Sequence, residues 1–234
     1  MSVLLLRLAG PLQAWGSAAR FARRTTESAP TKSGIVGLLA AAQGRAREAD
    51  LSDLAALRFG VRIDQPGTRV RDFQTAHHGD TDKAMPLSER FYLADAVFVA
   101  AVEGERALID ALHAALLAPV YLPYLGRRSC PPARRIDLRV RSDVSFGQAL
   151  RQEEWQASAW HKRRYARHAT VSLGLLTETA SGQDPDLTLR DQPHSFDPRH
   201  RRYGLRGIST TTVDLPTRGP GQLVHDPTAA LEGA

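Results

Sequence analysis

Side chains that could carry out acid–base chemistry gather between residues 160 and 168. This stretch holds His161, Lys162, Tyr165 and His168. A metal-independent ribonuclease uses such groups as general acid, general base and stabiliser of negative charge. The same residue types also occur together where a basic stretch simply binds RNA. The pattern therefore favours RNA binding and leaves metal-independent cleavage of RNA as an alternative.

A metal centre is not predicted from the remaining histidines or from the cysteine. His77 and His78 are adjacent, so on a strand or a turn their side chains point apart and do not readily hold one ion. The single cysteine, Cys130, allows neither an internal disulfide nor a cysteine-built metal cage. We expect Cys130 to be a packed thiol, and we expect no metal or other cofactor.

Residues 30–34 (PTKSG) resemble half of a phosphate-binding loop at a helix start. The full GxxxxGK[ST] pattern is absent because Thr31 stands where the second glycine belongs, so nucleotide hydrolysis is not expected. The free amides of a helix start and Lys32 nevertheless predict an anion site for a backbone phosphate, completed by Ser33 and the backbone of Gly34. Plain capping of the helix by Thr31 or Ser33 accounts for the same residues, and both interpretations can hold together.

Positive charge is concentrated in three segments. The chain has 31 Lys and Arg residues against 25 Asp and Glu, a net charge of +6, and only three of the basic residues are lysine. Residues 127–141, 160–168 and 199–206 hold most of the clustered arginines, and Asp137 is the one acid among them. An arginine-rich genome or solvated loops would explain a single cluster. Three clusters with interleaved aromatic residues favour a single-stranded nucleic acid, whose phosphates need cations and whose bases stack on flat rings.

The elements that must position these residues follow from hydrophobic periodicity and turn residues. We expect helices over 31–42 and 105–117, and strands over 3–8, 59–64, 68–75, 91–102 and 120–125. Pro66 and Gly67 make 68–75 the hairpin partner of 59–64. The order of the elements is strand, helix, strand, strand, helix, strand, which is the split βαβ or ferredoxin-like arrangement of an α+β fold. Residues 76–90 are too polar for the core and form an insertion.

The chain divides into three parts on this interpretation. Residues 1–132 form the ferredoxin-like domain, residues 133–215 a small and mostly β extension with strands over 136–140 and 170–176, and residues 216–234 a flexible tail. No apolar run approaches the roughly 20 residues that cross a bilayer, and no basic leader precedes the first apolar run. We therefore expect a cytoplasmic protein without a membrane partner.

Six short segments together carry a family resemblance. They are residues 8–16 (LAGPLQAWG), 30–39 (PTKSGIVGLL), 71–75 (RDFQT), 92–96 (YLADA), 124–131 (YLGRRSCP) and 190–193 (RDQP). In this order and spacing the chain resembles the fifth Cas family of the RAMP superfamily, as found in type I-E CRISPR Cascade complexes. The resemblance runs from about residue 1 to about residue 209.

The resemblance implies a ferredoxin-like domain with a protruding thumb, at about residues 76–90, and a small β extension. It also implies a non-enzymatic subunit that grips the five-prime handle of the CRISPR RNA. The neighbours would be a backbone subunit of the seventh Cas family and the large subunit that reads the PAM. Related subunits of type I-C systems cleave precursor RNA themselves, whereas type I-E relatives leave cleavage to a sixth-family endonuclease.

Candidate RNA-binding residues follow from the basic clusters and the resemblance taken together. They are Trp15, Arg20, Arg23, Arg24, Lys32, Ser33, Gly34, Arg71, His77, His78, Arg127 and Arg128. Trp15 is either a stacking platform for a base or a core residue at a strand end, and the sequence does not decide between them.

Two features depart from the family pattern, and a third function stays open. Phe73 and Gln74 stand where the family shows Tyr-His, so a hydroxyl or imidazole contact is not expected there. The predicted thumb is also short.

A general RNA chaperone is a weaker alternative, and it would show no preference for a repeat-derived handle.

Overall fold

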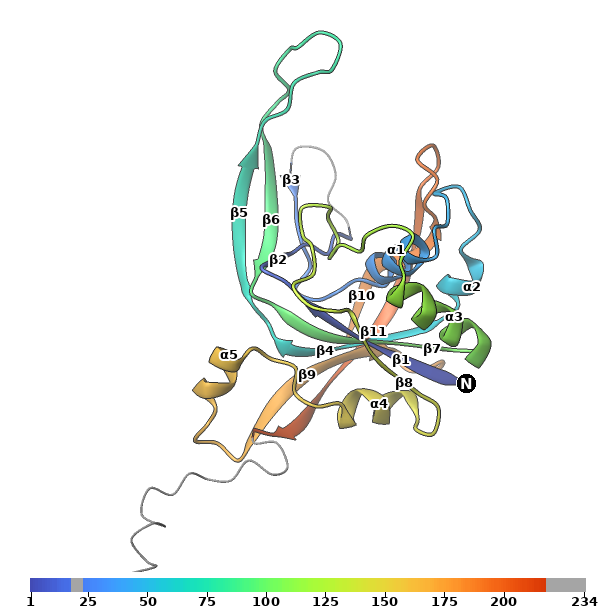
Figure 1. Cartoon of the computed structure of the whole chain (residues 1–234), viewed down its shortest axis with the longest axis vertical. Helices are drawn as coiled ribbons and strands as arrows, with labels where there is room; N and C mark the ends of the chain where they lie inside the picture. Colours follow the sequence, from blue (N-terminus) through green and yellow to red (C-terminus); the bar gives the residue numbers. More distant parts are fainter. Residues whose placement is uncertain (18–22, 218–234) are drawn as a thin grey trace, which may run out of the picture.

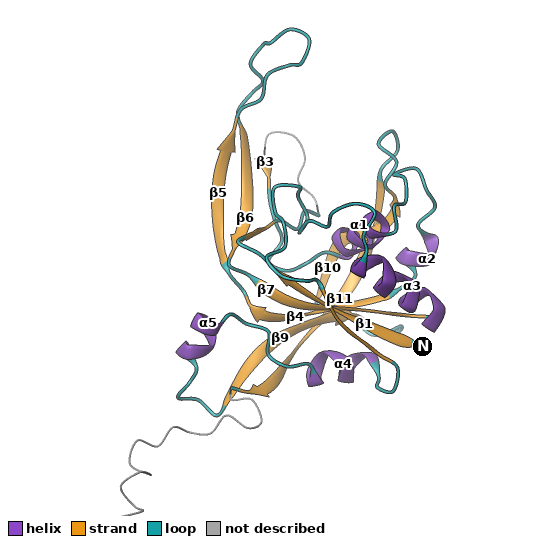
Figure 2. Ribbon diagram, viewed as in Figure 1, coloured by secondary structure: helices purple, strands orange, loops and turns teal. Residues whose placement is uncertain are grey.

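A seven-stranded antiparallel sheet is the frame of the molecule (Figures 1 and 2). The computed structural model describes residues 1–17 and 23–217. The strand order is β10-β11-β9-β4-β7-β1-β8. The strands are β1 (Ser2–Ala9), β4 (Arg58–Gln65), β7 (Val97–Gly104), β8 (Asp137–Arg141), β9 (Thr170–Glu178), β10 (Leu187–Ser195) and β11 (Arg202–Pro216). Arg20 and residues 218–234 of the predicted tail lie outside the described residues.

Helices cover both faces of this sheet. On one face lie α1 (Lys32–Ala42), α2 (Ser52–Ala55) and α3 (Arg106–Leu117); on the other lie α4 (Phe146–Gln152) and α5 (Ala159–Arg164) (Figure 2). Because strand side chains alternate, Leu4 and Leu6 join the core beneath α1 and α3, whereas Val3 and Leu5 pack against α4. Strand β1 is therefore buried on both faces.

A second, smaller sheet lies beside the first, and part of it projects as an arm. It contains β2 (Leu12–Gln13), β3 (Arg23–Arg24), β5 (Thr68–Gln74) and β6 (Ser88–Ala94). Strands β5 and β6 form a hairpin, and with the loop over 75–87 they rise away from the rest of the molecule (Figure 1). We call residues 68–94 the arm. Most of its side chains are exposed, in agreement with the predicted polar insertion.

Two strand predictions in this region are wrong. Strand 68–75 is not the hairpin partner of 59–64, because β4 is already paired on both sides, with β7 and β9, and has no free edge. It pairs with β6 in the smaller sheet instead. The single strand expected over 91–102 is two strands, separated at Asp95, whose φ of 56° breaks the extended conformation.

The strand predicted over 120–125 is also absent, and the reason lies at the end of α1. The backbone N–H of Val120 donates to Ala42 O at 3.0 Å, and that of Tyr121 to Ala41 O at 3.3 Å. The carbonyls of the last turn of a helix lack partners within the helix. Ala42 O takes the Val120 bond, and Ala41 O accepts from Tyr121 in addition to Gly44. Pro119 and Pro123 have no N–H with which to continue a ladder. The edge strand next to β1 is β8 instead, which confirms the strand predicted over 136–140.

The other predicted elements are confirmed. Strand 3–8 is β1, helix 31–42 is α1, strand 59–64 is β4, helix 105–117 is α3 and strand 170–176 is β9. The result is a mixed α/β fold around a curled antiparallel sheet, with β4, β7, β1 and β8 as consecutive neighbours. In the described ranges, no helix is long and apolar enough to span a membrane.

Candidate nucleic-acid interface

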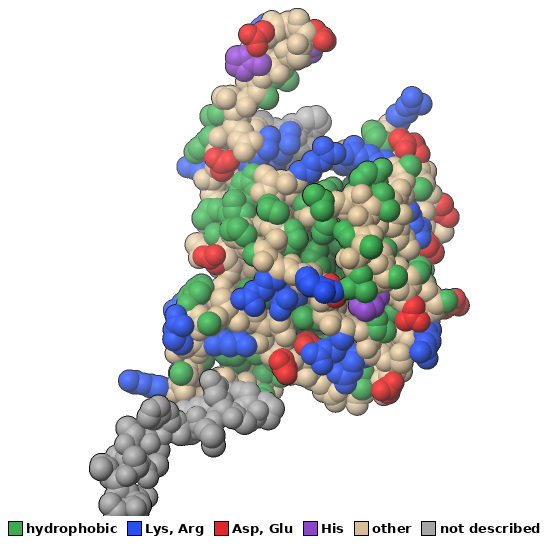
Figure 3. All heavy atoms as spheres, viewed as in Figure 1, with side chains coloured by type: hydrophobic (Ala, Val, Ile, Leu, Met, Phe, Trp, Pro, Cys, Tyr) green, Lys and Arg blue, Asp and Glu red, His purple; other side chains and the backbone are tan. Residues whose placement is uncertain are grey.

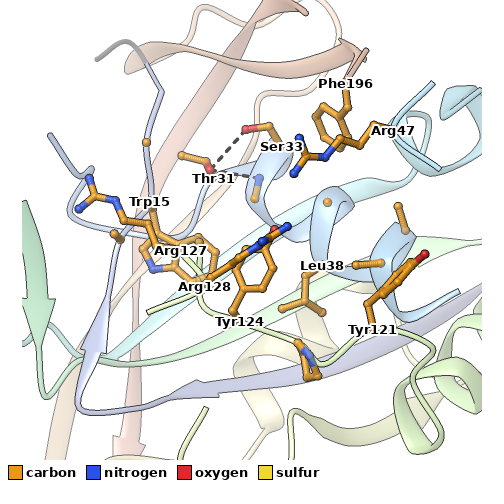
Figure 4. A pocket seen from close by; sticks show the side chains of 18 of the residues that line it. Trp15, Thr31, Ser33, Leu38, Arg47, Tyr121, Tyr124, Arg127, Arg128 and Phe196 are labelled. Carbon is orange, nitrogen blue, oxygen red and sulfur yellow. Dashed lines mark hydrogen bonds between the residues drawn. The ribbon is translucent and has the colours of Figure 1, made fainter. Parts of the chain in front are cut away.

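A cleft of about 1220 Å³ lies over the exposed side of α1 (Figure 4). Four regions from distant parts of the chain form its walls. They are residues 14–16 with residues 24 and 25, residues 45–47 after α1, the loop over 121–131, and the turn between β10 and β11 that carries Phe196 and Arg201. Small side chains of α1, among them Gly37 and Ala41, make its floor. Backbone and ligand can therefore approach each other closely along the helix.

Several arginines that line the cleft keep their guanidinium groups available. Arg47, Arg128 and Arg201 are exposed, and within residues 1–17 and 23–217 no hydrogen bond or ion pair engages their side chains. Arg45 differs, because it donates to both carboxylate oxygens of Asp53, at 2.6 and 2.5 Å. The cleft thus contains three arginines, on three separate segments, whose guanidinium groups can bind a ligand. This arrangement is suited to a chain of phosphates.

Aromatic rings stand beside these arginines. Tyr121 is 58% exposed and Tyr124 is 36% exposed, and both line the cleft. Across α1, Phe196 lies near Tyr203 with ring centroids 6.2 Å apart. Figure 4 shows Tyr124 and Arg128 on the loop wall, with Phe196 and Arg47 together at another side of the cleft. The bases of a single-stranded nucleic acid stack on aromatic rings, and its phosphates contact guanidinium groups, so the cleft offers both kinds of contact.

The anion site predicted at the start of α1 is taken by the protein's own carboxylates. The backbone N–H of Lys32 donates to Asp191 Oδ2 at 2.7 Å, and Lys32 Nζ donates to Glu178 Oε1 at 2.8 Å. Lys32 is only 4% exposed. Thr31 Oγ1 accepts from the N–H of Gly34 at 3.3 Å, so the capping interpretation is confirmed. Lys32 is therefore a structural residue, and its prediction as a phosphate ligand is wrong.

Trp15 belongs to the core and not to a stacking platform. Its side chain is fully buried, and its indole N–H donates to Gln13 Oε1 at 3.1 Å. The ring packs against the first turn of α1 so closely that a Cβ on Gly34 would lie 2.8 Å from it. Gly34 is thus needed for packing. Only Ser33, which is half-buried and lines the cleft, keeps the predicted position at its edge.

Arg127 is a structural clamp that holds the loop wall in place. Its guanidinium donates to the carbonyl oxygens of Phe91 at 3.1 Å and Arg24 at 2.8 Å, and it lies 4.8 Å from the centroid of the Tyr92 ring. The next residue, Arg128, is exposed in the cleft. The two adjacent arginines of the predicted pair therefore have different roles.

The other candidates lie on or beside the arm. Arg23 and Arg71 both contact Glu89, at 3.7 and 3.9 Å, and each guanidinium stacks on a phenylalanine ring, that of Phe91 or Phe73. Arg24 lines the cleft and has interaction partners of its own. His77 and His78 are exposed in the arm loop, distant in the chain from every segment of the cleft. The structure brings Arg24, Ser33 and Arg128 together and leaves Arg71 and the histidines on the arm.

Comparison with known proteins identifies the family. The family model described as CRISPR-associated protein (Cas_Cas5) matches residues 3–208. The chain belongs to the Cas5 family. The prediction made from the six sequence segments is therefore confirmed.

Individual relatives agree with this assignment. The CRISPR system Cascade subunit CasD of Escherichia coli K12 is 40% identical to this Cas5 chain over 151 residues, which are 56% of the chain and 67% of the relative. A chain of a solved CRISPR RNA-guided surveillance complex superposes with a TM-score of 0.75 at 35% identity, covering 94% of this chain and 95% of its own. A crystal structure of a Cas protein gives 0.70 at 37% identity, covering 92% and 95%.

The histidine group at 160–168 is part of an aromatic cluster. His161 is 8% exposed, and its ring centroid lies 6.0 Å from that of Trp155, 5.4 Å from Trp160 and 5.4 Å from Tyr165. Burial, with a contribution from Arg164, lowers the pKa of His161. An imidazole enclosed in this way packs the core beneath α5. It does not have the open position that a general acid or base needs.

No cluster suited to a metal ion is present in the part of the Cas5 chain that the structure describes. Cys130 is fully buried, as predicted, and burial raises the pKa of its thiol. A reactive cysteine needs exposure and a lowered pKa, so Cys130 is a packing residue.

Sequence reasoning missed part of the cleft of this Cas5 chain. Arg47 and Phe196 were not singled out, and Arg201 and Tyr124 were noted only within a cluster or a family segment. The signal for Arg201 was its place in the acid-free run 199–206. No local pattern marks Arg47 or Phe196, because only the tertiary fold brings them beside α1.

Proposed function

We propose that this Cas5 chain is a non-catalytic subunit of a CRISPR Cascade complex and binds the five-prime handle of the CRISPR RNA in the cleft over α1. The observation that carries the proposal is that one cleft contains both exposed aromatic rings and guanidinium groups that no protein side chain or carbonyl engages. Arg47, Arg128 and Arg201 supply the cations, and Tyr121 and Tyr124 supply rings. Family membership and the likeness to a surveillance-complex chain support the same assignment.

The chemistry of a single-stranded handle matches this cleft. Each guanidinium neutralises the charge of a phosphate and matches the geometry of its oxygens. Extruded bases stack on Tyr121 and Tyr124, and their edges then face the polar walls of the cleft. Stacking accepts every base, so preference for the handle comes from backbone shape and from base edges that the walls contact.

The fold suggests the parts of a Cas5 subunit. We assign β1, α1, β4, β7, α3 and β8 to a ferredoxin-like core, because their sheet order, β8-β1-β7-β4, is that of the split βαβ arrangement. The arm is then the thumb, longer than the 76–90 stretch because its strands extend to residues 68 and 94. The division into 1–132 and a β extension over 133–215 stays a proposal, and β8 from the second part pairs with β1 in the first.

The partners follow from the subunit role. The arm projects from the rest of the molecule (Figure 1), which supports a contact between it and a neighbouring backbone subunit of the seventh Cas family. Exposed Phe73, Met85 and Leu87 give it an apolar surface for that contact. The large PAM-reading subunit is the second proposed neighbour. In such a complex part of the arginine surface contacts protein and not RNA.

The ribonuclease alternative is not favoured by the position of its residues. His161 is enclosed by three aromatic rings, and Lys162 lies 5.7 Å from the centroid of the Trp155 ring. A direct test incubates the purified chain with precursor repeat RNA in EDTA. We expect binding without cleavage. Cleavage within the repeat that a His161→Phe or His168→Gln substitution abolishes would replace the proposed function by an enzymatic one.

Handle binding is tested by affinity for repeat-derived handle RNA and for a scrambled RNA of the same length. We expect the wild-type chain to prefer the handle. The triple variant Arg47→Ala, Arg128→Ala, Arg201→Ala should lose most of this affinity. The matched control removes three exposed arginines outside the cleft, Arg106→Ala, Arg151→Ala and Arg190→Ala, and should retain it. Equal loss in both variants would mean that only net charge matters, and equal affinity for both RNAs would favour a general chaperone.

A further inference from the structure

A second basic surface lies on the helix α5 and the turn that follows it. We call Trp160, Lys162, Arg163, Arg164, Arg167 and His168 the α5 face. No acid occurs in the sequence between Glu154 and Glu178, and among the described residues no ion pair engages Arg163, Arg164 or Arg167. All three arginines are exposed, and Trp160 is 44% exposed. Figure 3 shows basic side chains gathered over this part of the surface.

The α5 face and the cleft lie on opposite sides of the seven-stranded sheet. Along β9, Val171 and Leu173 pack with Trp155 beneath α5, and Leu175 joins them on that side in contact with the α4 core. The next residue, Leu176, points the other way and packs in the core beneath α1. Because alternate residues of a strand face opposite sides, one short strand of RNA in the cleft does not also cover the α5 face.

The α5 face rests on a rigid support. Beneath it, the Trp155 ring meets His161 at 6.0 Å and Tyr165 at 5.6 Å between centroids, both edge to face. The indole N–H of Trp155 donates to the carbonyl oxygen of Asp64 at 2.9 Å. The fully buried Arg62 donates to Asp64 and to the carbonyl oxygens of Leu150, Glu153 and Glu154, which fixes the chain that leads into α5. The exposed arginines are thus held on an ordered base.

Not all of the charge on the α5 face is free. Lys162 is half-buried, and burial lowers its pKa while Asp64 and Glu154 act in the opposite direction. Its ammonium lies 5.7 Å from the centroid of the Trp155 ring. Arg163, Arg164 and Arg167 are therefore the groups available to a partner, with Trp160 as the single large apolar side chain beside them.

We infer that the α5 face binds the phosphate backbone of a nucleic-acid duplex, separately from the handle in the cleft. A protruding helix with clustered arginines fits the outside of a duplex, whereas extruded bases need a hollow such as the cleft. The near absence of exposed apolar side chains disfavours a protein partner, whose interface core buries aromatic and aliphatic groups. Contacts through guanidinium groups to phosphates carry no sequence information, so this binding is independent of sequence. The inference does not depend on the proposed handle site.

The first test measures affinity of the full chain for a short blunt DNA duplex of arbitrary sequence over a range of salt concentrations. The variant Arg163→Ala, Arg164→Ala removes two cations and keeps good helix-forming residues. We expect duplex affinity to fall and the slope of log affinity against log salt to decrease by about two. The control Arg106→Ala, Arg190→Ala removes the same charge elsewhere and should leave both unchanged. Melting temperatures verify that all variants fold.

The second test uses tryptophan fluorescence. Trp160 is the exposed indole of the three, since Trp15 is 0% and Trp155 is 5% exposed. Quenching by acrylamide therefore reports mainly on Trp160, and Trp160→Phe should remove most of it. Saturating duplex should protect Trp160 from quenching, and handle RNA alone should not.

Results of either test can overturn the inference. One such result is duplex affinity that survives in the Arg163→Ala, Arg164→Ala variant, or that falls equally in the control. Another is unprotected Trp160 at saturating duplex. Protection by an acidic polypeptide but not by duplex would also reject it, in favour of a protein partner. Because handle affinity is measured with a separate RNA and separate variants, failure here leaves the proposed function untouched.

Discussion

Asp191 caps a helix that begins 159 residues before it, since its Oδ2 accepts a hydrogen bond from the backbone N–H of Lys32 at 2.7 Å. The same carboxylate accepts two bonds from Arg206, at 2.8 and 2.7 Å, and is fully buried. Strand β10 is thereby fixed to the start of α1. The wall of the cleft that carries Phe196 continues from β10, so this contact fixes that wall relative to α1, which forms the floor of the cleft.

Removing the Asp191 carboxylate should destabilise the whole fold. Asp191→Ala leaves Arg206 buried without its partner, and loss of one member of a buried pair costs about 3–5 kcal/mol. Asp191→Asn keeps an oxygen for the Lys32 N–H and should cost less. Urea unfolding of the three proteins measures these differences. The control Asp110→Ala breaks an exposed pair and should change stability by no more than about 1 kcal/mol. Equal stability of wild type and Asp191→Ala would contradict the role of the cap.

Lys32 and Arg128 should respond differently to substitution when RNA binding is measured against salt. Lys32→Met keeps the buried stem and removes a charge that faces Glu178, so we expect lower stability but an unchanged salt slope. Arg128→Ala removes a charge from the cleft and should reduce the slope by about 0.7, the contribution of one phosphate on a single strand. A reduced slope for Lys32→Met would return Lys32 to the RNA interface.

The sequence predicts those elements that rest on local pattern. Thr31 and the periodic apolar residues after it predict helix α1. The alternation of residues before the turn at Pro66 and Gly67 predicts β4. The pairing of strand 68–75 was not readable, because it depends on β9, which lies about a hundred residues later and takes the second edge of β4. The failed strand over 120–125 has the same origin, since its N–H groups bond to the end of α1.

The candidate site is likewise predicted only in part by the sequence. Residue type identified the arginines, but it does not show which of them are already engaged. Lys32 and Arg127 are residue types that bind phosphates, but their side chains are engaged within the protein. Lys32 is held by Glu178, and Arg127 is held by backbone carbonyls. Arg47 lies in an unremarkable helix-end segment and reaches the cleft only through the tertiary fold. Burial and pairing are long-range properties, so a list of basic residues over-predicts some positions and misses others.

Tyr124 should contribute to handle affinity through its ring and not through its hydroxyl. Stacking of one base on an aromatic side chain is worth about 1–3 kcal/mol. Tyr124→Ala should therefore weaken handle binding about fivefold or more, while Tyr124→Phe should retain most of it. Fluorescence anisotropy with labelled handle RNA makes the comparison. Leu205→Ala, a truncation of a residue that is 64% exposed outside the cleft, is the matched control. Equal loss for the Phe and Ala variants would point to the hydroxyl instead.

Stability should fall on mild acidification because of His161. Burial and Arg164 lower its pKa from the ordinary value of 6.5. The unfolded chain therefore takes up a proton at a pH where the folded chain does not, and the free energy of unfolding decreases as the pH falls through about 6.5. His161→Phe keeps an aromatic ring and should remove part of this pH dependence. Unfolding in urea at several pH values measures how the free energy of unfolding depends on pH. If that dependence is the same in His161→Phe as in the wild type, the effect belongs to other groups.

Gly126 should be the position in the loop wall that tolerates a side chain least. Its φ is +85°, and a Cβ would lie 1.7 Å from the carbonyl oxygen of Ala14. Gly182 has a similar φ of +82° with nothing within 4 Å of a Cβ, so it isolates the conformational cost alone. We expect Gly182→Ala to cost about 1 kcal/mol, the strain of a left-handed residue, and Gly126→Ala to cost about 3 kcal/mol or more because overpacking is added. The displaced loop carries Arg127 and Arg128, so handle affinity should fall in Gly126→Ala only. Similar stability and similar handle affinity in the two variants would show that the loop relaxes without moving the cleft wall, and that the contact between residues 14 and 126 does not position Arg128.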